Sequence, residues 1–231
     1  MAGVLMAVVV RNPPRAEAAI VDGFTGIGVA TVHEAMGRRG LLHPHLRPIW
    51  PGAAIAGSAV TVSVPPADNW MLHVAVEQCR PGDVLVVAPT SASDAGYFGE
   101  LLATAVAHRG VRGLVIDAGC RDIAELRRMG FPVWSAYVSA TGTIKATLGD
   151  VNTPIVCAGQ AIEPGDVVLA DDDGVVIVPR AEAAAVLEAS RARNEREAAL
   201  RSRYAAGEMS LDVGGMRDAL RAAGLTYVEA E

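Results

Sequence analysis

The run GLVIDAG at residues 113–119 constrains the fold more than any other segment, because it is a short apolar run of strand length. A strand without regular alternation of polar and apolar side chains is typical of a parallel sheet that is buried on both faces. The flanking runs ELLATAVAHRG (100–110) and RDIAELRRMG (121–130) have helical spacing, and each ends on a glycine. The first run predicts an apolar helix face made by Leu101, Leu102, Ala105 and Val106. With a further strand at FPVWSA (131–136), this order predicts crossover units and a largely parallel sheet.

The remaining segments predict that the sheet is mixed. Residues 52–64 (GAAIAGSAVTVSV) have the composition of a strand, and helices are expected at 26–40 and 69–78. The phrase PGDV occurs at Pro81 and at Pro164, each time before a β run, and so indicates one turn-and-strand device used twice. We therefore expect an α/β fold, a single compact layered β/β/α sandwich with a mixed sheet and an antiparallel portion.

The chain divides into a domain and a helical extension. Its 231 residues, 51% of them hydrophobic, can bury a full core, which we place at residues 1–180. Residues 181–231 form the extension, with one long helix expected over 181–206. The second half of that helix, RARNEREAALRSR (191–203), is charged on most faces. It would gain little by folding back on its own domain, so we expect it to contact a neighbouring subunit of a homo-oligomer, a trimer or hexamer. A solvated terminal helix is the alternative.

Charge and cysteine content limit the partners and the compartment. The net charge of −6 argues against a nucleic-acid partner or an anionic membrane surface. The apolar run at residues 1–10 is too short to span a bilayer and is expected to form an early strand. Cys79, Cys120 and Cys157 are widely spaced and suit a reducing cytoplasm. Cys120 adjoins Arg121 without an identifiable base, so a packed thiol is favoured over a nucleophile.

Charged side chains gather where the central strand gives way to a helix. Arg121 and Asp122 follow the strand directly, and Glu100 opens the preceding helix. Because ligands collect at the carboxyl ends of parallel strands, we expect these side chains to face one crevice. The guanidinium of Arg121 can hold a carboxylate through two parallel hydrogen bonds. The helix start at 99–102 offers unpaired N–H groups to the same anion.

The two acids of this group indicate a divalent metal. Two carboxylates about 4 Å apart repel by roughly 4 kcal/mol at an effective dielectric of 20, so acids packed this closely favour a cation. With no His or Cys nearby in a ligand pattern, Mg²⁺ or Mn²⁺ that retains several waters fits better than zinc. The spacing alone leaves a structural alternative open. Asp122 with Glu125 also matches a helix capping box, and Glu100 favours a helix N-terminus.

Other polar groups are weaker candidates. The three aspartates at 171–173 could bind a cation, but a tight hairpin that needs Asp-Gly explains them better. His33 begins a His-Glu pair without the second histidine of a zinc-protease motif. His43 and His45 lie in a proline-bearing loop, where structural or surface roles are favoured.

The run GELLATAVAHRGVRGLVIDAGCRDIAEL (99–126) resembles the signature of the metal-dependent pyruvate aldolases that act on 4-hydroxy-4-methyl-2-oxoglutarate and 4-carboxy-4-hydroxy-2-oxoadipate. Further stretches resemble the same enzymes in the same order, namely ATVHEAMGRRGLL, DNWMLHVA, GTIKATLG and PGDVVLADDDGVVIVP. The likeness extends from about Arg11 to about Tyr227. It implies a swivelling-domain-like fold with a long C-terminal helix and a 2-oxo acid as substrate.

The resemblance assigns roles to the charged residues. It implies that Asp122 is the direct metal ligand and that Arg121 clamps the pyruvyl carboxylate. Glu100 would hold the metal through water, as would a glutamate from a neighbouring subunit's C-terminal helix. Glu197 is the best match for that glutamate, and Glu195 is near enough to leave the choice open.

The resemblance also implies which groups contact the substrate. Glu125 matches the last acid of the motif, in a supporting position outside the direct metal contacts. His33 and Asn69 are candidates for contacts with the C4 substituent only because their segments match the family. The main chain that would cradle the substrate belongs to Gly99, Glu100, Leu101 and Leu102.

The implied reaction is retro-aldol cleavage to pyruvate plus oxaloacetate or a second pyruvate. Decarboxylation of oxaloacetate is expected as a side activity, because the same metal ion would stabilise the enolate in both reactions. The fold is shared with proteins that regulate ribonuclease activity by binding, and those proteins generally lack the acid that stands here as Glu100. A non-catalytic binding protein of that type is the alternative, and Glu100 favours the aldolase.

Metal chelation and Schiff-base trapping separate two aldolase mechanisms. The chain has a single lysine, Lys145, and it stands among small residues, where anion binding or a solvated loop charge explains it better than a Schiff base. We expect EDTA to abolish pyruvate release, and borohydride with pyruvate to leave the protein active. Covalent trapping at Lys145, detected by mass spectrometry, would contradict the metal mechanism.

Overall fold

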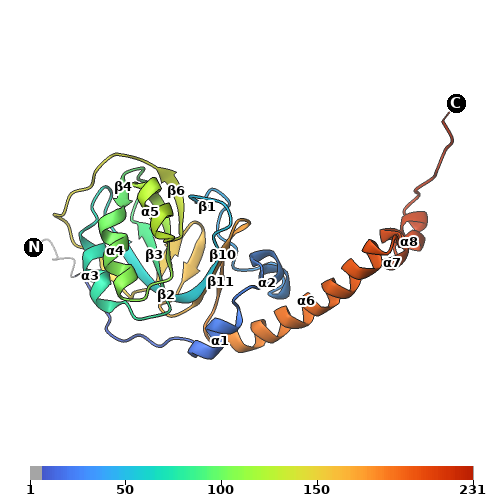
Figure 1. Ribbon diagram of the computed structural model, residues 1–231, viewed down its shortest axis with the longest axis horizontal. Helices are drawn as coiled ribbons and strands as arrows, with labels where there is room; N and C mark the ends of the chain where they lie inside the picture. Colours follow the sequence, from blue (N-terminus) through green and yellow to red (C-terminus); the bar gives the residue numbers. More distant parts are fainter. Residues whose placement is uncertain (1–6, 231) are drawn as a thin grey trace, which may run out of the picture.

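The computed structural model describes residues 7–230, and most of its strands lie in one nine-stranded sheet (Figure 1). β8 and β9 form a separate two-stranded sheet. The strands within the described residues are β1 (Arg47–Pro48), β2 (Ile55–Val64), β3 (Asp83–Pro89), β4 (Gly96–Phe98), β5 (Gly113–Cys120), β6 (Val133–Val138), β7 (Asp150–Val151), β8 (Ile155–Cys157), β9 (Gln160–Ile162), β10 (Val167–Asp171) and β11 (Gly174–Val178).

Helices α3, α4 and α5 follow strands of the parallel part of the sheet, and the other helices lie towards the two ends of the chain (Figure 1). The helices within the described residues are α1 (Ala18–Gly23), α2 (Val29–Ala35), α3 (Trp70–Gln78), α4 (Glu100–His108), α5 (Ile123–Met129), α6 (Ala183–Ala205), α7 (Ser210–Val213) and α8 (Arg217–Ala222).

The sheet is parallel in its centre and antiparallel at both sides. Its strand order is β1-β6-β5-β3-β2-β10-β11, with β4 paired to the end of β5 and β7 to the end of β2. Strands β2, β3, β5 and β6 run parallel, whereas β1, β10 and β11 are antiparallel to their neighbours. In the register of β5, Val115 stands between Val86 and Trp134. The run GLVIDAG is therefore a central strand, and the predicted α/β fold with a mixed sheet is confirmed.

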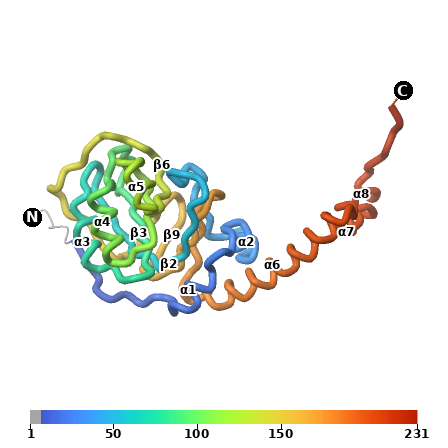
Figure 2. The backbone as a smooth tube through the Cα atoms, in the orientation of Figure 1, coloured from blue at the N-terminus to red at the C-terminus, as the bar shows by residue number. Residues whose placement is uncertain are grey.

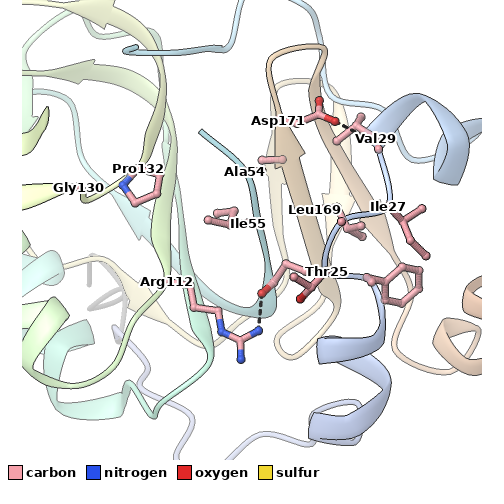
Figure 3. A pocket seen from close by; sticks show the side chains of 15 residues that line it. Thr25, Ile27, Val29, Ala54, Ile55, Arg112, Gly130, Pro132, Leu169 and Asp171 are labelled. Atoms are coloured by element: carbon pink, nitrogen blue, oxygen red, sulfur yellow. Dashed lines mark hydrogen bonds between the residues drawn. The ribbon is translucent and has the colours of Figure 1, made fainter. Parts of the chain in front are cut away.

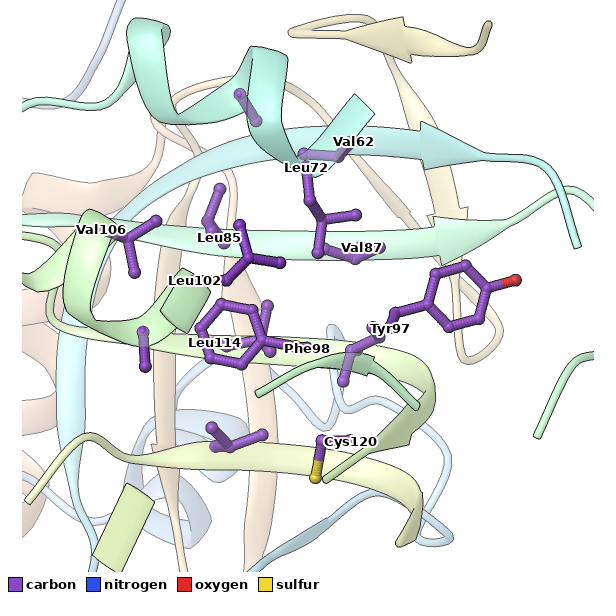
Figure 4. Packing of buried hydrophobic residues seen from close by; sticks show 14 of the residues in the cluster. Val62, Leu72, Leu85, Val87, Tyr97, Phe98, Leu102, Val106, Leu114 and Cys120 are labelled. Atoms are coloured by element: carbon purple, nitrogen blue, oxygen red, sulfur yellow. The ribbon is translucent and has the colours of Figure 1, made fainter. Parts of the chain in front are cut away.

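Helices α3, α4 and α5 pack on one face of the parallel strands. Figure 4 shows Leu72 of α3 and Leu102 and Val106 of α4 against Leu85 and Leu114 of the strands, and all five side chains are buried. Removing one large aliphatic side chain from water stabilises the fold by roughly 1.5–3 kcal/mol. This packing fixes the starts of the three helices relative to the carboxyl ends of the strands.

The sheet curls around a second core on its other face. Trp134 of β6 is fully buried there, and its Nε1 donates a hydrogen bond to the carbonyl oxygen of Asp171 at the end of β10 (2.8 Å). Three strands separate β6 from β10 in the sheet order, so this bond is possible only because the sheet is strongly curved.

The C-terminal helix leaves the body of the protein after its first half. Val186 and Leu187 of α6 pack with α1 and α2 on the β10–β11 hairpin. Beyond this contact α6 projects into open space and ends in α7 and α8, as the tube in Figure 2 shows. The expectation of one long helix over 181–206 is confirmed by Ala183–Ala205.

Some elements differ from the sequence expectations. The helix expected over 26–40 is limited to Val29–Ala35, because the chain turns at Gly37 with a φ of 69°. Residues 7–10 make only an isolated bridge through Val9, and the rest of the predicted early strand lies outside the described residues. Within residues 7–230, no helix combines the length and the apolar character needed to cross a bilayer.

Candidate active site

The ends of β4 and β5 bring the two halves of the predicted site together. β4 runs parallel to the end of β5, and the N–H of Arg121 donates to the carbonyl oxygen of Phe98 (2.8 Å). α4 begins two residues after Phe98, and α5 begins two residues after Arg121. Both helices therefore start at the same edge of the sheet, as the sequence predicted.

Asp122 connects these two helix starts. Its Oδ2 accepts a hydrogen bond from the backbone N–H of Glu100, the first residue of α4 (3.0 Å). Asp122 itself is in the left-handed region (φ 58°, ψ 42°) and makes no side-chain cap to its own helix α5. The capping-box alternative for Asp122 and Glu125 is therefore wrong. The left-handed backbone turns the carboxylate away from α5 and towards α4.

Gly99 makes this approach possible. It precedes α4 in an extended conformation (φ −153°, ψ −167°), which any residue can adopt. Space is the constraint instead, because a Cβ atom built on Gly99 would overlap with Oδ2 of Asp122 and lie 3.1 Å from Cγ of Arg121. A side chain at this position would push the carboxylate off the N-terminus of α4.

Arg121 lies open to solvent beside Asp122. Its Nε is 3.9 Å from Oδ2 of Asp122, and the two side chains are 46% and 41% exposed. A Cβ atom built on Gly142 would lie 3.8 Å from Nη1 of Arg121, so the loop that contains Gly142 forms one wall beside the guanidinium. The guanidinium of Arg121 therefore has N–H donors available to bind an anion.

The two glutamates of the motif differ in their surroundings. Glu100 stands in the first turn of α4, where its Oε1 accepts a hydrogen bond from the hydroxyl of Thr104 (3.2 Å). Glu125 is exposed in the first turn of α5, and the structure gives it no hydrogen bond within the described residues. Only Glu100 belongs to the helix start that Asp122 contacts.

The donor set fits a hard divalent ion better than a soft one. The Asp122 carboxylate lies at the backbone N–H of Glu100, whose own carboxylate belongs to the same first turn of α4, and Cys120, which precedes Arg121, is buried. Among residues 7–230, no three His, Cys, Asp or Glu side chains converge as a complete ligand set. Mg²⁺ is commonly bound through one or two carboxylates and retains several waters, so such an arrangement suits it.

The start of α4 presents its backbone to this region. Leu102 is buried in the core, whereas Leu101 is 82% exposed. The predicted apolar face of α4 is confirmed at Leu102 and Val106 and wrong at Leu101 and Ala105, which are exposed. Ala103 is the third residue of α4 that faces the core.

Glu197 does not approach Asp122 within one chain. It lies on α6 and pairs with Arg193 one turn earlier (2.8 Å), and α6 packs on α1 and α2 rather than on α4 or α5. Glu195, on the same helix, is exposed. Whether either glutamate joins a neighbouring subunit's site therefore stays a prediction.

The remaining candidates from the sequence make contacts within the chain. The aspartates at 171–173 form the β10–β11 turn, where Asp171 pairs with Gly174, as predicted. His33 Nδ1 lies 3.0 Å from the carbonyl oxygen of Arg39, and α2 is on the side of the protein away from α4. Asn69 Nδ2 donates to the carbonyl oxygen of Tyr97 (2.9 Å), just ahead of the Gly99 turn.

The three cysteines are packed thiols. Burial raises the pKa of the Cys120 thiol, whose Sγ lies 3.3 Å from Oγ of Ser135. Burial likewise raises the pKa of Cys79 to about 12 and raises that of Cys157. Because a thiolate is the reactive form, these residues are inert at neutral pH.

A cleft of the described structure lies away from Asp122. It has a volume of about 590 Å³ and opens between the α1–α2 connection and the starts of β5 and β6 (Figure 3). Its charged side chains are already engaged, because Arg112 donates to Asp22 and Asp171 accepts from the N–H of Val29 (2.8 Å). Without convergent unpaired groups, this cleft does not form a catalytic constellation.

Sequence reasoning missed the residue that holds the wall beside Arg121. Asp68, 1% exposed, accepts hydrogen bonds from the N–H groups of Trp70 (2.9 Å), Ala146 (2.8 Å) and Thr147 (2.7 Å). Burial alone would raise its pKa, but the three N–H groups hold the pKa of Asp68 below its ordinary value. The phrase PPADNW indicates only a turn before α3, and nothing local in it points to residues 146–147.

Comparisons with known proteins bear on this geometry. The sequence model of one family, described as RraA-like: Aldolase/RraA, matches residues 29–177, which include the Gly99 turn and Asp122. A protein of Halalkalibacterium halodurans, named as a proposed 4-hydroxy-4-methyl-2-oxoglutarate aldolase, is 27% identical over 77% of this chain and 84% of its own. A protein of the same name from Burkholderia multivorans is 32% identical over 67% of this chain and 95% of its own.

Solved structures agree with the family match. An uncharacterised protein from Pseudomonas syringae pv. tomato has a TM-score of 0.74 at 25% identity, and the match covers 85% of this chain and 97% of that one. RraAS2 of Streptomyces coelicolor, described as an unusual member of the RNase ES inhibitor RraA family, has a TM-score of 0.73 at 27% identity. That match covers 82% of this chain and 98% of the other.

The close approach at Gly99 generates a prediction. Gly99→Ala should free the N–H of Glu100, and the overlap with the Asp122 carboxylate should destabilise the protein by about 1–3 kcal/mol. The change is measured by urea unfolding and by amide hydrogen exchange at the start of α4. Gly142→Ala, whose new methyl group meets Arg121 only at 3.8 Å, is the matched control. Unchanged exchange at Glu100 in Gly99→Ala would show that the contact contributes little.

Proposed function

The chain belongs to the RraA-like family described as Aldolase/RraA, and we propose that it is a metal-dependent pyruvate aldolase. The substrates would be 4-hydroxy-4-methyl-2-oxoglutarate, 4-carboxy-4-hydroxy-2-oxoadipate, or both. Cleavage of the C3–C4 bond would release pyruvate together with a second pyruvate or oxaloacetate. The names of the relatives from Halalkalibacterium halodurans and Burkholderia multivorans support the reaction class.

One observation carries the proposal. The carboxylate of Asp122 is held at the N-terminus of α4 between Glu100 and the guanidinium of Arg121. A 2-oxo acid needs a cationic clamp for its carboxylate, donors for its keto oxygen, and a group that takes a proton. Arg121, the start of α4 and Glu100 meet these needs at one place.

The chain's own residues would perform distinct steps. Arg121 would bind the C1 carboxylate through two parallel N–H donors and so orient the C2 keto group. The N–H groups at the start of α4, around Leu101, would donate to the oxygens on which charge develops. Glu100 would take the C4 hydroxyl proton, directly or through an intervening water. Loss of that proton lets the C3–C4 bond break and leaves the enolate of pyruvate, which a proton at C3 converts to pyruvate.

A divalent ion would be held by Asp122 directly and by Glu100 through water. When bound, Mg²⁺ or Mn²⁺ supplies a Lewis acid that stabilises the enolate charge. The same stabilisation would allow decarboxylation of oxaloacetate, since the electron pair left by departing CO₂ forms the same enolate. We therefore include this side activity in the proposal.

The second candidate is a binding protein without catalysis. The similarity to RraAS2, described as a member of the RNase ES inhibitor RraA family, favours it. The alternative requires no metal and no proton acceptor, so it leaves the placement of Glu100 beside Asp122 without a role. This placement is the reason to prefer the aldolase.

The two candidates differ in metal-dependent turnover. With 4-hydroxy-4-methyl-2-oxoglutarate and Mg²⁺ the protein should release pyruvate, and Asp122→Ala should lower the rate by about a hundredfold or more because the ion loses its direct ligand. Asp173→Ala, which removes an exposed carboxylate from the β10–β11 turn, is the control and should retain activity. A lactate-dehydrogenase-coupled assay measures the product. Absence of metal-dependent turnover on every 4-hydroxy-2-oxo acid tested would favour the binding protein.

The proposal includes assembly of the chain into a closed homo-oligomer. Apolar side chains are exposed around the Arg121 site. Soluble monomers rarely expose a large contiguous apolar patch, so such side chains favour an interface. They belong to Leu101, Tyr137, Val138, Ile144 and Leu148. A neighbouring subunit that covers this rim would exclude water from the reaction, and the projecting α6 could carry Glu197 to a second chain.

A subunit-mixing experiment tests the shared site. Asp122→Ala and Glu197→Gln should each be inactive, and unfolding and reassembling them together should restore activity, because about a quarter of the sites would then receive both native residues. Glu195→Gln identifies the glutamate, since it should remain active alone if Glu197 is the one used. Failure of the mixture to regain activity would place all groups in one chain.

A further inference from the structure

The loop of residues 139–149 is held to the protein by its main chain. It follows β6, and Figure 1 shows it as the yellow-green segment that runs from β6 towards α3. The side chains of this loop are exposed or half-buried throughout, so none of them anchors it in a hydrophobic core. Its position therefore depends on the hydrogen bonds of its backbone.

The near end of the loop confines the side chain of Arg121. The N–H of Gly96 in β4 donates to the carbonyl oxygen of Thr141 (2.8 Å), and the next residue, Gly142, adjoins the guanidinium. In the described part of the chain no hydrogen bond fixes that guanidinium, and its Nε is 3.9 Å from Oδ2 of Asp122. The loop is therefore the wall that limits the directions open to Arg121.

Asp68 holds the far end of the loop. Its Oδ2 accepts hydrogen bonds from the N–H groups of Ala146 (2.8 Å) and Thr147 (2.7 Å), and its Oδ1 accepts from the N–H of Trp70 in α3 (2.9 Å). Burial opposes the charge of this carboxylate, but the three N–H groups, with Lys145 nearby, hold the pKa of Asp68 below its ordinary value. The carboxylate is therefore ionised at neutral pH, and the bonds that tie the loop to α3 are charge-assisted.

We propose that Asp68 is a positioning residue, which acts through the loop of residues 139–149 to keep the Arg121 guanidinium oriented for a carboxylate. The inference rests on the proposed function, in which Arg121 binds the C1 carboxylate of a 2-oxo acid. A long side chain that is already confined loses less conformational entropy when it binds an anion. An arginine that must first be ordered binds the same anion more weakly, although its charge is unchanged.

The inference separates binding of the anion from binding of the metal ion. Asp122, the proposed direct ligand, is held by the N–H of Glu100, and the loop has no part in that contact. Loosening the loop should therefore weaken the binding of a carboxylate and leave the affinity for a divalent ion unchanged. A merely structural role of Asp68 would not produce this difference, because a general loss of stability does not distinguish between two ligands of the folded protein.

Asp68→Asn tests the inference with pyruvate and Mn²⁺ as probes. The amide places an NH₂ group or a single acceptor where the carboxylate receives three N–H donors, so hydrogen exchange at Ala146 and Thr147 should become faster. Calorimetry at saturating Mn²⁺ should show pyruvate binding weakened by about fivefold, the size expected when one long side chain must be ordered on binding. The affinity for Mn²⁺ alone, measured by EPR, should keep its wild-type value.

Asp166→Asn is the matched control. Asp166 is also buried and accepts hydrogen bonds from the N–H groups of Glu163 and Arg180 (both 2.9 Å), but it lies directly before β10, at the amino ends of the parallel strands. This variant should lose stability in a similar way and retain the wild-type affinity for pyruvate. If Asp68→Asn does not fold, Thr147→Pro weakens the same anchor by removing one N–H donor at an exposed position, and it should weaken pyruvate binding in the same direction.

The outcomes separate this inference from the proposed function. Wild-type pyruvate affinity in Asp68→Asn or Thr147→Pro, an equal loss in Asp166→Asn, or a parallel loss of Mn²⁺ affinity would overturn the role of Asp68. If pyruvate binding depends on Asp68 as expected but no 4-hydroxy-2-oxo acid is cleaved, the proposed function fails while the positioning role stands. Cleavage by a protein whose pyruvate affinity is independent of Asp68 would overturn the inference alone.

Discussion

The contact between the Asp122 carboxylate and the N–H of Glu100 determines the geometry of the whole site. It requires a left-handed residue at the end of β5, a neighbour without a side chain at Gly99, and parallel pairing of β4 with β5. The left-handed backbone of Asp122 is locally unfavourable, whereas the glycine and the strand pairing are neutral. Together they bring the N-termini of α4 and α5 to the same place. The strain of a left-handed aspartate is of the kind that proteins retain at functional sites.

Much of this arrangement could be predicted from sequence, because strands and helices of the crossover units have clear hydrophobic periods. The run GLVIDAG and its flanking helices fix which residues lie at the carboxyl edge, and Arg121, Asp122 and Glu100 meet there. Sequence spacing does not encode φ, so the capping-box pattern at Asp122 and Glu125 suggested a contact that the backbone does not permit. The place of the charged residues at this edge of the sheet was therefore predictable, but not the direction of the Asp122 carboxylate.

Contacts between distant segments were beyond sequence reasoning. Asp68 binds the N–H of Ala146, 78 residues later, and a buried aspartate in a turn carries no local signal of such a partner. The exposed position of Leu101 was missed for a related reason. Several apolar stripes fit one short helix, and α4 uses the one that places Leu102 and Val106 inside. Tertiary packing, rather than periodicity, decides between such stripes.

An open site has a chemical consequence. Arg121 and Asp122 are about half exposed in the single chain, and the exposed Leu101 borders them. An enolate that forms in open water gains little from fixed donors, since water screens them and competes for the oxygen. Retro-aldol chemistry at this edge therefore requires that water be excluded from the site. A second copy of the chain could do this by covering the exposed apolar side chains, and the projecting α6 is long enough to contact such a copy. Under the proposed function, catalysis and assembly are one requirement, because a single chain holds the charges but not the dry surroundings that make them effective.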